Sequence, residues 1–109
     1  MEYLFVYGQF RDSGRSHLGK IVKCGKSSVS GRMYRVNEFY PGLVEGDGLV
    51  WGDVYLIDPA VLPSLDEFEG DEYERKKIKT HTDLECWVYI YKYDISKFSE
   101  IQSGDWFLR

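Results

Sequence analysis

The segment DPAVLPSLDEFEG, Asp58 to Gly70, carries the clearest helix signal in this 109-residue chain. Asp58 is a typical N-cap residue, and Pro59 suits the first helical position because its missing N–H costs nothing there. Gly70 is a natural residue at the end of a helix. The spacing therefore predicts one helix, from about Pro59 to Glu69, within a chain that is otherwise rich in strand patterns.

One face of this helix is apolar and includes a single carboxylate. At about 100° per residue, one arc of the helix surface holds its apolar side chains: Val61, Leu62, Leu65 and Phe68. Glu69 falls within that arc, whereas Asp66 falls just beside it and Glu67 on the opposite side. Loss of hydration and the helix C-terminus both disfavour the charged carboxylate, so we expect a raised pKa for Glu69. Such a glutamate suits general acid–base catalysis near neutral pH. The alternative is that the last turn frays, and Glu69 turns to solvent or pairs with Arg75.

Strand patterns occupy most of the remaining chain. Apolar runs and period-two alternation predict five strands, at residues 3–7, 28–36, 49–57, 75–80 and 85–93. Residues 11–20 are expected to form a loop or short irregular helix, and residues 38–48, with one proline and three glycines, a long turning segment. The chain has no internal repeat or linker. It is therefore expected to form a single domain, residues 1–109, of the α+β class.

Composition excludes several classes of function. A net charge of −4 and a pI of about 5.1 provide no electrostatic footprint for nucleic acid. No apolar run approaches the roughly 18 residues of a membrane span, and the N-terminal stretch lacks the basic region of a signal peptide. We therefore expect a cytoplasmic protein. The two cysteines, Cys24 and Cys86, lack the paired spacing of a metal site.

Six stretches occur in a familiar order: FVYGQF (residues 5–10), YPGLV (40–44), GDVYLID (52–58), LDEFEGDEYER (65–75), CWVYIY (86–91) and SGDW (103–106). Together they resemble the gamma-glutamylcyclotransferase-like superfamily, also called avirulence-induced-gene-like. They are most similar to its small bacterial members of the YtfP kind and to gamma-glutamylamine cyclotransferase. The resemblance covers essentially the whole chain. It implies a small mixed α+β fold built around a partly closed, strongly bent β-barrel.

The resemblance also implies a set of site residues. The family's Tyr-Gly-Ser/Thr-Leu loop, whose backbone amides hold the substrate, corresponds to Tyr7, Gly8, Gln9 and Phe10. Gln9 and Phe10 depart from that pattern and are expected to reshape the pocket. The family's catalytic glutamate corresponds to Glu69, and its pocket tyrosines correspond to Tyr73 and Tyr89. No metal or organic cofactor is implied.

The implied reaction is an internal cyclisation. The alpha-amine of a gamma-glutamyl compound attacks its own side-chain carbonyl, closes 5-oxoproline and expels an amine or peptide, with Glu69 moving the protons. The acidic Gly70-Asp71-Glu72 stretch predicts a preference for cationic gamma-glutamylamines over anionic substrates such as glutathione. Two alternatives stay open. One is a binding module for an amino-acid-like ligand without turnover, and the other is an interaction protein that docks a partner through residues 103–109. The leaving amine and the oligomeric state also stay open.

Overall fold

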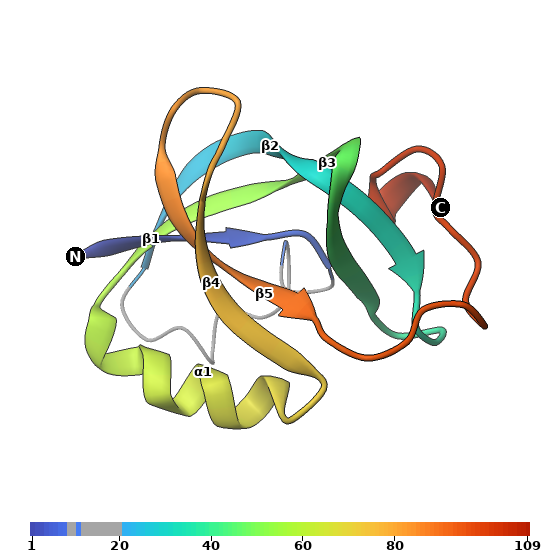
Figure 1. The fold of residues 1–109 in the computed structure, drawn as a ribbon. Coiled ribbons are helices and arrows are strands. Elements are labelled where there is room, and N and C mark those ends of the chain that lie inside the picture. Colours follow the sequence, from blue (N-terminus) through green and yellow to red (C-terminus); the bar gives the residue numbers. More distant parts are fainter. Residues whose placement is uncertain (9–10, 12–20) are drawn as a thin grey trace.

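The computed structural model describes residues 1–8, 11 and 21–109 (Figure 1). The loop or short irregular helix expected at residues 11–20 lies outside them, except for Arg11. The described elements are the strands β1 (Glu2–Val6), β2 (Ile21–Arg35), β3 (Pro41–Ile57), β4 (Tyr73–Lys79) and β5 (Glu85–Tyr91), the helix α1 (Leu62–Glu69), and short 3-10 turns at Pro59–Val61 and Trp106–Leu108. No helix within these ranges is long and apolar enough to cross a bilayer.

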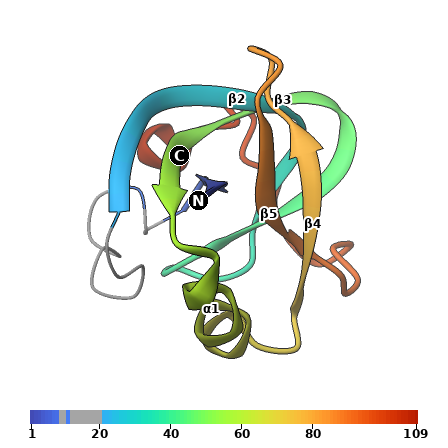
Figure 2. The same cartoon turned by 90° about the vertical axis from the view of Figure 1, so that its left-hand side faces the viewer.

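The five strands form one mixed sheet in the order β2-β3-β1-β5-β4. The central strand β1 runs antiparallel to β3 and parallel to β5. Figure 2 shows the sheet curling from β2 round to β4, with α1 beneath it. The expected α+β class and strongly bent sheet are therefore confirmed. The sheet is not closed into a barrel, because the described parts of β2 and β4 form no ladder with each other.

The helix begins and ends where the sequence predicts. The Asp58 side chain accepts a hydrogen bond from the Ala60 N–H at 3.0 Å, and Pro59 opens the first turn, which is a 3-10 turn. Gly70 ends α1 with a φ of 79°, in a conformation that glycine adopts without a Cβ penalty. The local capping signals were therefore sufficient to place this element.

The prediction of a long turning segment at residues 38–48 is wrong from Pro41 onward. Residues 41–44 pair with residues 32–35 of β2, so that β2 and β3 form one long hairpin. Glycines are accommodated here because neighbouring backbone or ring atoms approach closely. A Cβ added at Gly42 would lie 2.8 Å from the Tyr91 Cβ, and one at Gly48 would lie 2.7 Å from the Gly31 carbonyl oxygen.

Alternate residues of β1 supply two hydrophobic clusters, as expected for a strand whose side chains point to opposite faces. Phe5 of β1 and Tyr7, which directly follows the strand, pack into the larger cluster, which includes Trp106. Leu4 and Val6 pack against Leu62 and Leu65 of α1, together with residues of β3 and β5. The helix is thus held against the strand whose end carries the predicted binding segment. Trp106 is 3% exposed, so this aromatic residue of the C-terminal segment belongs to the core.

Candidate functional site

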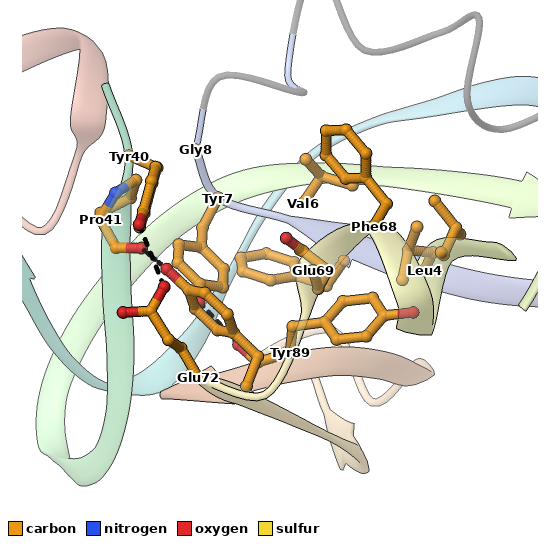
Figure 3. Close-up of a pocket in the computed structure, with 13 residues that line it drawn as sticks. Leu4, Val6, Tyr7, Gly8, Tyr40, Pro41, Phe68, Glu69, Glu72 and Tyr89 are labelled. Atoms are coloured by element: carbon orange, nitrogen blue, oxygen red, sulfur yellow. Dashed lines mark hydrogen bonds between the residues drawn. The ribbon is translucent and has the colours of Figure 1, made fainter. Parts of the chain in front are cut away.

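A cavity of about 300 Å³ lies where the end of β1 meets α1 and the start of β3. Its wall combines aliphatic and aromatic side chains with the carboxylates of Glu69 and Glu72 (Figure 3). The structure brings together at this cavity five of the residues predicted for the site: Tyr7, Gly8, Glu69, Tyr73 and Tyr89. Gln9 and Phe10, which were predicted to bind substrate, lie outside the described residues.

Glu69 is the last residue of α1 and is half-buried in the cavity wall. Figure 3 shows its side chain beneath β1, near Val6, Tyr7 and Phe68. Burial raises the pKa of Glu69 from its ordinary value of 4.5 to about 7, because the surroundings disfavour the charged form. A carboxyl group with this pKa exchanges its proton readily near neutral pH, which is the property expected of a general acid–base residue.

Arg75 does not neutralise this carboxylate. Its guanidinium contacts Asp66 instead, with Nε 2.7 Å from Oδ1 and Nη2 3.0 Å from Oδ2. This pair holds the pKa of Asp66 below its ordinary value, chiefly through the hydrogen bond from Arg75. The alternative in which Glu69 pairs with Arg75 is therefore not the arrangement found. The guanidinium of Arg75 is paired with Asp66, and the Glu69 side chain faces the cavity.

The three predicted tyrosines shape the cavity, but their hydroxyls are engaged elsewhere. The Tyr7 hydroxyl donates to the Tyr89 carbonyl at 2.6 Å and accepts from the Leu43 N–H at 3.2 Å. The Tyr73 hydroxyl donates to the Pro41 carbonyl at 2.7 Å, and the Tyr89 hydroxyl donates to Asp66 at 2.8 Å. Burial raises the pKa of all three phenols above the ordinary value of 10. They consequently present neutral ring faces to a ligand.

Gly8 is needed at the cavity for a packing reason. A Cβ at this position would lie 2.9 Å from Cδ of Pro41, closer than real Cβ contacts allow. The missing side chain lets the chain after β1 pass directly beside the start of β3. The sequence prediction attributed this glycine to contact with a ligand, and the structure adds contact with Pro41.

Two residues with polar side chains extend the cavity beyond the predicted set. The Tyr40 hydroxyl donates to Glu72 Oε1 at 3.1 Å, and the Tyr40 ring meets the Tyr73 ring edge-on at a centroid distance of 6.3 Å. Glu72 was predicted only as part of an acidic rim, and Tyr40 was not assigned a role. No local signal marks Tyr40, because it reaches the cavity through the long β2–β3 hairpin.

The described residues contain no group of three or more His, Cys, Asp or Glu side chains able to hold a metal ion.

Comparison with known proteins identifies related chains. The model of the family described as "Gamma-glutamyl cyclotransferase, AIG2-like" matches residues 4–108. The gamma-glutamylcyclotransferase family protein YtfP of Escherichia coli K12 is 37% identical over 107 residues, which cover 94% of each chain. The gamma-L-glutamyl-butirosin B gamma-glutamyl cyclotransferase of Niallia circulans is 28% identical, over 97% of this chain and 76% of that protein.

Solved structures show the same fold. The solution structure of Escherichia coli ytfP superposes with a TM-score of 0.77 at 38% identity and covers 95% of both chains. An aig2-like protein from Mus musculus superposes with a TM-score of 0.74 at 24% identity, over 86% of this chain and 80% of that one. At that identity the mouse protein is evidence for the fold alone.

Proposed function

The chain belongs to the gamma-glutamyl cyclotransferase, AIG2-like family, and on that premise we propose that it converts a gamma-glutamyl amine or peptide to 5-oxoproline and a free amine. The observation that carries the proposal is the half-buried Glu69 carboxyl group, with a pKa of about 7, in the wall of a 300 Å³ cavity. The cavity also includes Gly8, from the segment that resembles the substrate-binding loop of the family.

The proposed reaction moves two protons from the substrate's alpha-nitrogen to the leaving nitrogen by way of one carboxylate. The ionised Glu69 takes a proton from the substrate's alpha-ammonium, so that the amine nitrogen can attack the gamma-carbonyl carbon. A new C–N bond closes the five-membered ring and gives a tetrahedral intermediate. Glu69, now protonated, gives this proton to the leaving nitrogen as the original amide C–N bond breaks. The ionised Glu69 then removes the second proton from the ring nitrogen, and the released amine takes it up as an ammonium. The products are 5-oxoproline and the amine, and no water is consumed.

The pKa of Glu69 suits both transfers. Near pH 7 a group with a pKa of about 7 is present in both its basic and its acidic form, so it can first accept a proton and then donate one. General acid–base help of this kind contributes roughly 10²–10⁴ in rate. Burial makes the carboxylate a stronger base than an exposed glutamate, because ionisation is disfavoured in the cavity.

The remaining cavity residues are proposed to bind and orient the substrate. The main-chain N–H group of Gly8, together with those of Gln9 and Phe10 that the resemblance to the family implies, would hold the alpha-carboxylate or stabilise the oxyanion that develops on the carbonyl. Tyr7, Tyr73 and Tyr89 would enclose the glutamyl carbons with their ring faces. Rings that are already fixed by hydrogen bonds lose little conformational freedom on binding, which favours a single bound geometry.

The charge of the cavity supports a preference among leaving groups. Glu69 and Glu72 both line it, and none of the described lining residues is a lysine or an arginine. An amine that keeps a second positive charge would meet an attractive field there, whereas an anionic peptide such as glutathione would be repelled. We therefore propose cationic gamma-glutamylamines as the preferred substrates. Equal turnover of cationic and anionic substrates would contradict this preference.

The test of the proposed activity is a 5-oxoproline release assay across gamma-glutamyl amines and peptides. It compares the wild-type protein with Glu69→Gln and with Glu67→Gln, which changes an exposed acid on the same helix. Release by the wild type and the Glu67 variant at similar rates, with release by the Glu69 variant slower by roughly 10²–10⁴-fold, supports the proposal. If calorimetry detects binding of these compounds but no substrate yields 5-oxoproline, the protein is a binding module instead.

A further inference from the structure

A buried ionic cluster lies near the cavity and has no part in the proton transfers described above. Arg11 is 3% exposed, and its guanidinium contacts two buried acids. Nε lies 3.1 Å from Asp53 Oδ2, and Nη1 lies 2.7 Å from Asp105 Oδ1. Lys23 and Lys26, which are more exposed, lie 3.6 Å from Asp53 and 3.8 Å from Asp105. Each of the two acids therefore has two cationic neighbours.

The main chain of Arg11 is hydrogen-bonded to that of Gly8, the glycine in the cavity wall. The Arg11 N–H donates to the Gly8 carbonyl at 3.1 Å. The Arg11 carbonyl in turn accepts a hydrogen bond from the Tyr55 hydroxyl at 2.6 Å, and Tyr55 is fully buried in β3. Both the main chain and the side chain of Arg11 are thus attached to the sheet. Any displacement of Arg11 would pull on the carbonyl of Gly8.

The place of this cluster along the chain gives it a specific role. The ladder between β1 and β3 ends at the pair Val6 and Asp53. After Val6, the Tyr7 hydroxyl holds the chain through Leu43 and Tyr89, and Arg11 holds it three residues beyond Gly8. Gly8 therefore lies between two anchors. The second anchor begins at Asp53, the residue where the strand pairing stops.

Stability alone is a weak explanation for such a cluster. Removing charges from water is costly, and a buried ion pair is often no more stabilising than well-packed apolar side chains of similar volume. Its two acids come from distant parts of the chain, β3 and the C-terminal segment, and the fork of the guanidinium gives the contacts a defined direction. A cluster of this kind is better suited to fixing a position than to adding free energy.

We propose that Arg11 is a positioning residue. Its buried guanidinium is fixed by ion pairs with Asp53 and Asp105, and its main chain thereby holds Gly8 in the cavity wall at the distance from Glu69 that the substrate requires. The catalytic consequence rests on the proposed function, whereas the positioning of Gly8 does not. Because Arg11 does not line the cavity, its effect on the reaction is indirect.

The test compares Arg11→Lys with Arg32→Lys as the matched control. Arg32 also contacts two carboxylates, Asp47 and Glu100, but on an exposed part of the sheet. Three quantities are measured: kcat and KM for 5-oxoproline release, the hydrogen exchange of the residue 11 amide, and the midpoint of unfolding. If Arg11→Lys does not fold, the variant Arg11→Met/Asp53→Asn/Asp105→Asn, which leaves no unpaired buried charge among the three, takes its place.

We expect the Arg11 variant to exchange the residue 11 amide at least roughly tenfold faster, because the bond to Gly8 opens more often. Its kcat/KM should fall by roughly 10²-fold, as for a displacement of about 1 Å, mainly through KM. The pH dependence of kcat/KM for the Arg11 variant should stay the same as for the wild type. Unchanged exchange, or a kcat/KM equal to that of the control in folded protein, would overturn the inference. If the wild type releases no 5-oxoproline, the proposed function fails, and the exchange measurement decides the role of Arg11 by itself.

Discussion

Replacing Glu69 by glutamine should make the folded protein more stable above neutral pH, although it removes the proposed catalytic group. The reason is that burial raises the pKa of Glu69 from 4.5 to about 7. Below pH 4.5 the residue is protonated in both the folded and the unfolded chain, and its ionisation has no effect on stability. Above that pH the unfolded chain ionises first, while the folded protein keeps the proton.

The size of the effect follows from the two pKa values. Each pH unit between them lowers the free energy of unfolding by about 1.4 kcal/mol, and the loss is complete once Glu69 ionises in the folded state. From 4.5 to about 7 the total is about 3 kcal/mol. Glutamine cannot ionise, so the Glu69→Gln protein avoids this loss. The advantage of the variant should therefore grow from pH 4 to pH 8 by about 3 kcal/mol.

The assay is urea denaturation of the wild type, Glu69→Gln and Glu67→Gln at several pH values. Other titrating groups are common to all three proteins, so the difference from the wild type isolates the substituted residue. Glu67→Gln removes an exposed acid of the same helix and serves as the matched control. A difference for Glu69→Gln that stays constant, or that shrinks as pH rises, would refute the argument that burial controls this carboxyl group.

Three further predictions concern residues that hold the site in place. Leu65→Ala should destabilise the protein by about 2–5 kcal/mol in urea denaturation because Leu65 is 1% exposed, whereas Leu49→Ala, at a 43% exposed position, should stay within about 0.5 kcal/mol. Asp66→Asn should cost about 1 kcal/mol at pH 7, since its arginine partner and its own side chain are partly exposed, and the cost should disappear as pH falls through the lowered pKa of Asp66. Gly8→Ala should raise KM because its Cβ would meet Pro41 at 2.9 Å, and adding Pro41→Ala should restore part of the loss.

The helix and its carboxylate could be predicted from sequence because their signals are local. Asp58, Pro59 and Gly70 act on the backbone within a few residues of their own positions. The orientation of Glu69 toward the apolar face of the helix follows from helical spacing alone. Phe68 was placed on the same apolar arc, yet it is 48% exposed, because it lies at the cavity rather than under the sheet.

Features that depend on distant residues could not be predicted in this way. The glycines of residues 41–48 signal a turn locally, but the segment belongs to β3, which pairs with β2. These positions are glycine because Tyr91 and Gly31 approach them closely from elsewhere in the sheet. Tyr40 enters the cavity only through the β2–β3 hairpin. Arg11 meets Asp105 across a sequence separation of 94 residues, so a reading of neighbouring residues assigns it to an ordinary polar loop.

Whether Glu69 transfers the protons can be measured from the dependence of kcat/KM on pH. Measured as 5-oxoproline release, the ratio of wild-type to Glu69→Gln activity removes the titration of the substrate's own ammonium, which is common to both proteins. We expect this ratio to fall as pH drops through about 7, the pKa of Glu69, because the protonated residue cannot accept a proton. A ratio that stays constant from pH 5 to pH 9, or that is close to one throughout, would contradict it.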